Sequence, residues 1–514
     1  MCAFIDIRTK SLYNCSNMLK QMFKTISLGV TSILLLSSCG VKEIAFSRYT
    51  YNEVDSDTHE AIETENYYKL GDYNPLTYLN DKGETESIDS YASMYRTTNY
   101  LKMMNTTGIS KMIVVPVDFD DYSCEKLGHG CALSKTIIQN AFFGDNSVNQ
   151  YESVASFFDK SSYGKLKIDG KVTNWFRCPV SYEELSKPST GKSIVLNIYN
   201  AALKWYKENY NDISSYYVNG VENLGVPLYL VYSAPNVTGD DVSNSALWAY
   251  TFNSGGLCAW TSFSMLNLNL YNEPDSHTLI HETGHLLGLL DYYAENGQYS
   301  PTGHVDMMDY SIGDETGYSK MSLNWTRPYV IKDTGRITIS DFESSGDLVL
   351  IKDNWNKTAM DEYLLLELYS PTKLNKFDVD HPQSNAKLMD KIGIKVYHVD
   401  ARAAFFENKT RPVSYVSSGG YSKSTYRIGL AHSNTVRNTS EFTKYPLYEL
   451  MPKDGVTSFL NGGSATNETL FYEGDSFGIT TYQDFKFHDG SDLGYTFVIE
   501  SIKDNKATIS FIKK

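Results

Sequence analysis

The sequence predicts an α+β protein: a domain with a twisted sheet and a histidine-bearing helix, followed by an antiparallel, β-sandwich-like C-terminal region. Three observations predict this class. The chain has 514 residues, more than one ordinary domain holds. Strand-like and helix-like patterns alternate up to about Pro328. Beyond Pro328 helical periodicity nearly vanishes, and short apolar runs are separated by Gly, Asp, Asn and Ser, which is typical of antiparallel sheets.

The first domain is expected over residues 108–330. Its sheet is predicted from apolar or alternating runs of strand length at 112–119, 226–235 and 265–272. Residues 193–210 carry apolar side chains at helical spacing, which predicts a helix. A further pair of strands is expected to turn at Asp169-Gly170.

The second domain is expected over residues 331–514, where runs such as EYLLLELY and GIKVYHVD predict short strands. His398 and Asp400 close the second of these runs. We interpret them as a surface pair at the end of a strand rather than as a site.

The composition excludes one class of partner. Lys and Arg total 46 against 61 Asp and Glu, a formal charge of −15. An acidic chain without a basic stripe is repelled by phosphate backbones, so we expect no nucleic-acid partner. The 40 tyrosines and 6 tryptophans suit a β-rich fold.

The N-terminus has the features of an export signal. Residues 1–38 are the expected signal region, with Met18 or Met22 as the true start, a lysine, a short apolar core and then small residues. The run LSSCG resembles a bacterial lipobox, which predicts lipidation of Cys39 and a membrane-anchored protein at the cell surface. A plain cleaved signal, giving a freely secreted protein, is the alternative.

Residues 39–107 are polar, acidic and rich in tyrosine, without a sustained period. Such a segment predicts a tether or a pro-region rather than a packed domain.

Four cysteines remain in the exported part, an even number. Cys124 and Cys131 bracket a short polar loop, which predicts a local disulfide. A metal site that includes His129 is the weaker alternative, because the pair lacks the second half of a zinc ligand set. A pairing of Cys178 with Cys258 cannot be deduced from the sequence.

The segment SHTLIHETGHLLGLLDYY carries the chemistry. His281, Glu282 and His285 form H-E-x-x-H, and four residues of helix place the two histidines on one face, about 6 Å apart along the axis. Two imidazoles so placed can bind one zinc ion, with Glu282 beside them as a general base. The alternative is a core helix with solvated histidines. The leucines around the motif make the helix apolar nearly all round, so the histidines need partners.

A catalytic zinc ion needs a third protein ligand. Gly288 can end the helix in a left-handed conformation and let the chain turn back, which aims Asp291 at the metal. Glu295 and His304 are alternative third ligands. His277 shares the helical side of the motif, but we expect it to be solvated, because four protein ligands would close the site to water.

The extended pattern H-E-x-x-H-x-x-G-x-x-D resembles the metzincin clan of zinc endopeptidases, with aspartate in place of the more common third histidine. That clan has a methionine-containing turn beneath the metal, and Met308 and Tyr310 match it. Core filling is the simpler interpretation of a Met-Met pair taken alone, but after the extended zinc motif we expect the turn. The resemblance implies that Tyr310 stabilises the tetrahedral intermediate.

Three segments together resemble the immune inhibitor A family of secreted bacterial metalloproteases: HETGHLLGLLDYY, VDMMDYSIGDETGYSKMSLNW and ASFFDKSSYGKLKIDGKVTNWF. The similarity covers roughly residues 108–400. It implies a metzincin-like zinc protease domain and an extracellular endopeptidase made as a latent precursor. The lipid anchor and the short polar region before residue 108 depart from the family pattern.

The sequence thus predicts a zinc-dependent endopeptidase that acts on extracellular proteins or peptides. A surface adhesin or glycan-binding protein with a structural or vestigial zinc site is one alternative, and a hydrolase of non-peptide amides is another. Ca²⁺ is a further candidate ligand, because several loops are rich in oxygen atoms, but no residues can be assigned to it.

Overall fold

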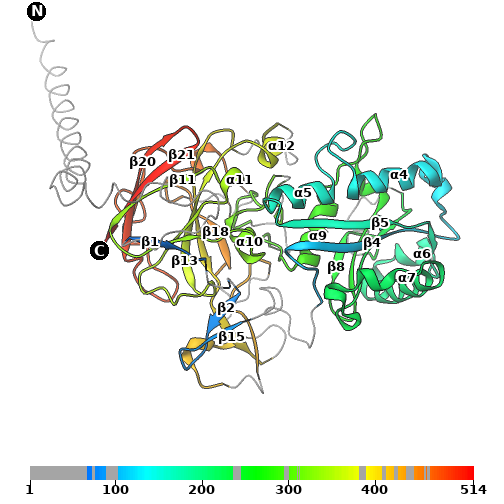
Figure 1. Ribbon diagram of the computed structural model, residues 1–514, viewed down its shortest axis with the longest axis horizontal. Helices are drawn as coiled ribbons and strands as arrows, with labels where there is room; N and C mark the ends of the chain where they lie inside the picture. Colours follow the sequence, from blue (N-terminus) through cyan, green and yellow to red (C-terminus); the bar gives the residue numbers. More distant parts are fainter. Residues whose placement is uncertain are drawn as a thin grey trace, which may run out of the picture.

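The computed structural model describes residues 66–71, 74, 76–87, 102–235, 245–294, 300–309, 311, 313–380, 389–407, 412–421, 426–435, 445–456, 459 and 463–514. The signal region and Cys39 lie outside the described residues. Two lobes lie side by side (Figure 1), one built from helices around a sheet and one built mostly from strands. Within the described residues no helix has both the length and the apolar character needed to cross a membrane.

A six-stranded sheet forms the centre of the N-terminal lobe, in the order β5-β4-β7-β9-β8, with β6 also paired to β4. All its pairs are parallel except the one that joins the edge strand β8 to β9. The strands are β4 (Gly108–Asp118), β5 (Leu166–Val172), β6 (Phe176–Arg177), β7 (Pro227–Tyr232), β8 (Tyr250–Phe252) and β9 (Leu257–Ser262).

Helices cover both faces of this sheet (Figure 1). They are α4 (Gly130–Phe143), α5 (Val154–Ser161) and α9 (His277–Leu287) on one face, and α6 (Tyr182–Leu185) and α7 (Val195–Asn209) on the other. Because successive side chains of a strand point to opposite faces, Met112 and Val114 pack with the first group while Ile113 and Val115 pack with the second. The strands predicted near 112–119 and 226–235 and the helix predicted near 193–210 are confirmed.

The turn predicted at Asp169-Gly170 is wrong. Both residues lie inside the single strand β5, which pairs in parallel with β4 along its length. A Cβ atom at Gly170 would lie 2.1 Å from the Met112 carbonyl oxygen. The glycine therefore permits close approach of two backbones, which is its other common role in a strand.

The half-exposed strand predicted over 265–272 is also wrong. A short 3₁₀ helix (Phe263–Leu266) is followed by a loop in which Leu270 is 99% exposed. Asn267 adopts a left-handed conformation, with φ of 44°, and the Asn269 side chain accepts hydrogen bonds from the backbone N–H groups of Tyr271 and Glu273. The hydrogen bonds of these asparagines favour a turn over the strand that the alternating leucines predict.

The C-terminal lobe contains two sheets packed face to face. The first has the order β1-β10-β12-β13-β14-β18 and the second β11-β21-β20-β19. Side chains such as Leu364, Ile394 and Phe497 fill the space between them, as in a β-sandwich. The strands are β10 (Tyr329–Ile331), β11 (Gly335–Ser340), β12 (Leu348–Ile351), β13 (Glu362–Tyr369), β14 (Gly393–Asp400), β18 (Tyr448–Leu450), β19 (Ser476–Phe477), β20 (Tyr495–Lys503) and β21 (Lys506–Lys513). Their pairs are antiparallel except β10 with β12.

Part of the segment predicted to be a tether or pro-region belongs to this lobe. Strand β1 (Tyr67–Lys69) pairs with β10, and Tyr67 and Leu70 are buried. A hairpin of β2 (Thr77–Leu79) and β3 (Thr85–Ser87) follows, near a small sheet of β15 (Ala403–Phe406), β16 (Pro412–Tyr415) and β17 (Arg427–Leu430). Alternation is too short in these three-residue strands to be seen in the sequence.

The two lobes share one hydrophobic core. Leu365 and Tyr397, on the face of the first sheet turned away from the sandwich interior, join the same apolar cluster as Phe157 and Met308 of the N-terminal lobe. Three short helices belong to this part of the chain: α10 (Gly317–Ser322) precedes β10, α11 (Phe342–Ser345) follows β11, and α12 (Leu374–Asp380) follows β13. The β-rich lobe therefore packs against the lobe whose helix α9 carries the histidine motif.

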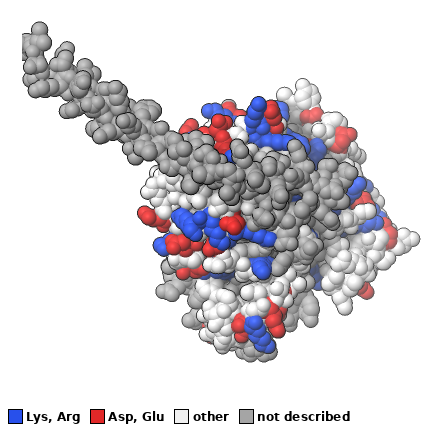
Figure 2. Space-filling view, turned by 60° about the vertical axis from the view of Figure 1, so that its left-hand side comes forward, with Lys and Arg blue, Asp and Glu red and all other residues white. Residues whose placement is uncertain are grey.

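Surface charge is mixed in sign on the face shown in Figure 2, where Lys and Arg side chains are interspersed with Asp and Glu side chains. Exposed ion pairs, such as Lys486 with Asp492, also occur among the described residues.

Candidate metal centre and active site

Helix α9 carries the histidine motif and ends where the sequence predicts. Gly288 follows its last residue with φ of 105° and ψ of 7°, a left-handed cap whose N–H donates to the carbonyl oxygens of Gly284 and His285. A residue with a Cβ atom adopts this conformation only at a cost. The cap turns the chain back toward the helix, so that Asp291 faces the motif.

The side chains of His281, His285 and Asp291 converge on one point. The Nε2 atoms of both histidines lie 3.1 Å from Asp291 Oδ1. Zinc bonds of about 2.0–2.1 Å in tetrahedral geometry imply ligand atoms roughly 3.3 Å apart. Both nitrogen-to-oxygen distances are close to that spacing, and the three donor atoms all lie within 4.8 Å of one another, so the residues fit the metal that the sequence predicts.

The second nitrogen of each imidazole is held by the backbone. His281 Nδ1 lies 3.0 Å from the Met307 carbonyl oxygen, and His285 Nδ1 lies 2.9 Å from that of Leu289. A carbonyl can only accept, so both Nδ1 atoms carry a proton, and in each ring a metal would bind at Nε2 in place of any proton there.

Electrostatics in the cluster follow from this arrangement. Burial alone would raise the pKa of the Asp291 carboxyl, but the two imidazoles outweigh it and hold that pKa well below its usual range. Burial likewise opposes protonation of His281, yet its contact with Asp291 raises its pKa to about 9. The carboxylate is therefore charged and available as a ligand at neutral pH.

Glu282 lies beside the ligands but is not one of them. The residue is 6% exposed, and its Oε2 accepts a hydrogen bond of 2.7 Å from the Thr251 hydroxyl on edge strand β8. Burial is the main cause that raises the pKa of Glu282, and the nearby Asp291 charge adds to it. No pattern in the sequence indicated that Thr251 belongs to the site, because it lies on a strand 31 residues before Glu282.

Met308 lies directly beneath the motif helix. It is fully buried, and a Cβ atom at Gly284 would lie 2.5 Å from its sulfur. The fully buried Asp306 holds the turn, since its Oδ1 accepts from the Met308 N–H and its Oδ2 from the Thr316 N–H. The role of Met308 in a methionine turn beneath a metal stays a prediction.

The alternative ligands are not part of the cluster, as far as they are described. The His304 ring contacts Asp309, at 3.2 Å, and His277 contacts Asp275, at 2.9 Å. Glu295 and Tyr310 lie outside the described residues.

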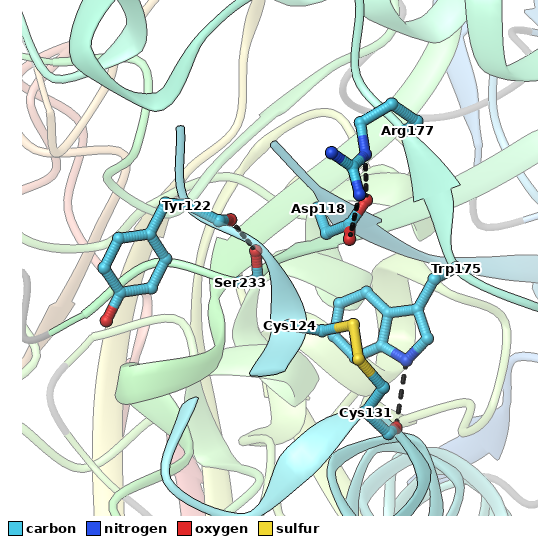
Figure 3. The surroundings of a disulfide bond; sticks show 7 residues. All are labelled: Asp118, Tyr122, Cys124, Cys131, Trp175, Arg177 and Ser233. Atoms are coloured by element: carbon cyan, nitrogen blue, oxygen red, sulfur yellow. Dashed lines mark hydrogen bonds and ion pairs between the residues drawn. A yellow bond between two sulfur atoms is a disulfide. The ribbon is translucent and has the colours of Figure 1, made fainter. Parts of the chain in front are cut away.

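Cys124 and Cys131 are joined in a disulfide (Figure 3). Trp175 Nε1 donates to the Cys131 carbonyl oxygen at 3.0 Å. Because both sulfurs are bonded to each other, a metal site at this pair is excluded. Cys178 and Cys258 are both buried thiols and are not paired.

Figure 3 also shows Arg177 in two contacts with Asp118, at 2.8 and 3.0 Å. Asp118 is the last residue of the central strand β4, so this pair fixes the start of the loop that carries the disulfide.

The sequence interpretation missed a second cluster in the C-terminal lobe. Glu362, His398 and His488 bring potential ligand atoms within 4.8 Å of one another. The surface pair expected at His398 and Asp400 is wrong, because both residues are buried. The alternation of side chains along the strand could have indicated this burial, because it places His398 and Asp400 on the same face as Ile394 and Val396, which fill the sandwich interior.

Among the described residues, none of the groups of three or more His, Cys, Asp and Glu side chains that could hold a metal ion is made of carboxylates alone, and Ca²⁺ stays a prediction without residues. Comparison with models of known protein families and with curated protein sequences gives no match. The resemblance to the immune inhibitor A family therefore also stays a prediction.

Proposed function

We propose that the chain is a zinc-dependent endopeptidase with a metzincin-like catalytic domain, similar to the immune inhibitor A family. The observation that carries the proposal is the convergence of two imidazole nitrogens and one carboxylate oxygen at 3.1 Å, with a fourth polar side chain, Glu282, beside them. The His₂-carboxylate donor set is one that catalytic zinc ions use in proteins.

Each residue of the site has a separate role in this proposal. His281, His285 and Asp291 would hold zinc, which when bound acts as a Lewis acid and makes water a nucleophile near neutral pH. Glu282 accepts the proton of the attacking water and delivers it to the leaving amine. Thr251 holds Glu282 Oε2 in one orientation, and the backbone carbonyls of Met307 and Leu289 fix the two imidazole rings.

The edge strand beside the site favours a peptide substrate. Strand β8 pairs only with β9 in the described sheet, and it carries both Thr251 and the half-exposed Tyr250. An extended peptide can add to such an edge through backbone hydrogen bonds, which brings its carbonyl groups past Glu282. The non-peptide amide alternative lacks a feature of this kind. An adhesin with a structural zinc site would need no buried glutamate next to the ligands.

Digestion of unfolded casein by the purified chain tests the proposal. We expect fragments that disappear when 1,10-phenanthroline removes the metal and return when zinc is added in slight excess. Cleavage that continues in the chelator, or no cleavage of casein and of a mixed peptide library by zinc-loaded protein, would contradict it. Export to the cell surface through Cys39 is a separate proposal, tested by labelling with a fatty-acid probe.

A further inference from the structure

We propose that Glu362, His398 and His488 hold a second divalent metal ion, of the zinc class, inside the C-terminal lobe. The three residues come from strands β13 and β14 and from the loop before β20. This inference goes beyond the proposed peptidase and does not depend on it.

The donor atoms of the second cluster have the spacing of metal ligands. His398 Nε2 lies 2.9 Å from Glu362 Oε1, and His488 Nδ1 lies 3.5 Å from the same oxygen. These two distances bracket the roughly 3.3 Å expected between ligands of one tetrahedral zinc ion. Asp400 Oδ2, which is 2.9 Å from His488 Nδ1, can serve as a fourth ligand.

The outer contacts also match those of a metal centre. His398 Nδ1 lies 2.9 Å from Oε1 of Glu449, the residue of β18 that pairs with His398 in the sheet. A carboxylate behind a ligating histidine fixes the ring and makes its other nitrogen more basic. The ring of His488 is stacked on Tyr445, with 3.6 Å between centroids, so its direction is fixed as well.

One buried carboxylate oxygen of the cluster accepts no hydrogen bond. Glu362 is fully buried, and its Oε2 has no hydrogen-bond partner. The nearest cationic group is the Arg402 guanidinium, 3.4 Å away, which makes shorter contacts of 2.6 and 2.7 Å with Asp400. A buried carboxylate oxygen left in this way is costly, and a bound cation would satisfy it.

The charges around the cluster leave room for a cation. Three carboxylates, those of Glu362, Asp400 and Glu449, face one arginine, Arg402. Counted without the histidines, these groups carry two excess negative charges, which a divalent ion would balance when it takes the place of protons on the ligating rings. Imidazole and carboxylate donors together suit zinc and neighbouring transition metals better than calcium or magnesium.

The site borders a large cavity. His488, Arg402, Tyr415 and Tyr445 belong to the wall of a cavity of about 990 Å³ that lies between β2, the β15–β16 sheet and the sandwich. An ion bound by Glu362, His398 and His488 would tie the loop before β20 to two strands at one end of the sandwich.

Cobalt titration of four full-length proteins tests the second site, since Co²⁺ replaces zinc and its visible absorption reports its ligands. After removal of metal, we expect the wild type to bind two Co²⁺ ions and the double variant His281→Gln/His285→Gln to bind one. His398→Gln should also bind one. The matched control is His304→Gln, at a histidine that contacts Asp309 and belongs to neither cluster, and it should bind two.

One result overturns the second site: a double variant that binds no Co²⁺. This variant leaves the second cluster intact, so the result does not depend on whether His398→Gln folds. A His398→Gln protein that still binds two ions would equally overturn the ligand assignment. A wild type and a double variant that each bind one ion would support the second site and contradict the zinc centre of the proposed peptidase.

Discussion

The two histidine clusters of this protein are built in different ways. In the helix cluster, His281, His285 and Asp291 lie within eleven residues, and backbone carbonyls orient the imidazoles. In the strand cluster, the ligands span Glu362 to His488, and a carboxylate orients His398.

Their carboxylates differ as well. Of the two carboxylates at the helix cluster, Asp291 contacts both histidines, whereas the Glu282 carboxylate accepts a hydrogen bond from the Thr251 hydroxyl and none from a histidine or arginine. In the strand cluster, each of Glu362, Asp400 and Glu449 already contacts a histidine or arginine side chain. Proton transfer requires a carboxylate beside the ligands that is not held in an ion pair. The comparison teaches that the first cluster is suited to chemistry and the second to holding an ion and a loop.

The largest expected effect comes from removing the Glu282 carboxylate. Glu282→Gln keeps the shape of the side chain and its contact with Thr251 but cannot accept a proton. We expect casein cleavage to fall by about 10²–10⁴-fold, the usual range for a general base, while zinc content by elemental analysis stays the same. Glu183→Gln, a change at a side chain that is 79% exposed, is the control. Full activity of Glu282→Gln would remove the chemical difference between the clusters.

Asp291→Ala separates the clusters by their metals. Loss of one of three ligands should weaken zinc binding at the helix cluster by at least about 100-fold, beyond the cost of losing an outer contact. The ion proposed at Glu362 should remain, so the Co²⁺ count falls from two to one. His304→Ala is the matched control, because His304 contacts Asp309 and not the cluster. Unchanged metal content in Asp291→Ala would point to a third ligand outside the described residues.

The same contrast explains what the sequence could predict. A helix fixes the geometry between residues four apart, and a glycine cap is visible as a single letter, so the helix cluster could be placed from spacing alone. The strand cluster depends on the register of β13 with β14 and of β14 with β18, and on where the loop before β20 folds back. No local pattern specifies such long-range pairing.

The errors in the fold have a similar origin. Leucines that alternate over 265–272 suggested a strand, but side chains of asparagine bonded to the local backbone there. The three-residue strand β1 pairs with β10, some 260 residues away in the chain, which only tertiary packing determines. Long apolar strands and the amphipathic helix α7 were predictable because their patterns extend over many residues.

Glu449→Gln tests the outer contact of the strand cluster. An amide is a weaker acceptor than a carboxylate for His398 Nδ1, so we expect Co²⁺ affinity at the second site to fall by about 10–100-fold. Binding at the helix cluster should not change, because its outer acceptors are carbonyls. Glu468→Gln, at a side chain that is 81% exposed, provides the control. An unchanged second affinity would show that Glu449 does not orient a metal ligand.

The smallest effect is expected from Gly284→Ala, which probes how tightly the helix cluster is packed on Met308. The added methyl group would lie 2.5 Å from the Met308 sulfur, so the helix or the turn must shift. Overpacking of this kind costs about 1–3 kcal/mol, and the better helix propensity of alanine returns up to about 1 kcal/mol. Urea unfolding should therefore show a net loss of about 1–2 kcal/mol. Gly71→Ala, where the nearest atom would lie at 3.9 Å, should change stability by less than about 0.5 kcal/mol. If the clash is the cause, Met308→Ala should cost less in the Gly284→Ala background than in the wild type, and strict additivity would show that helix and turn are not in contact.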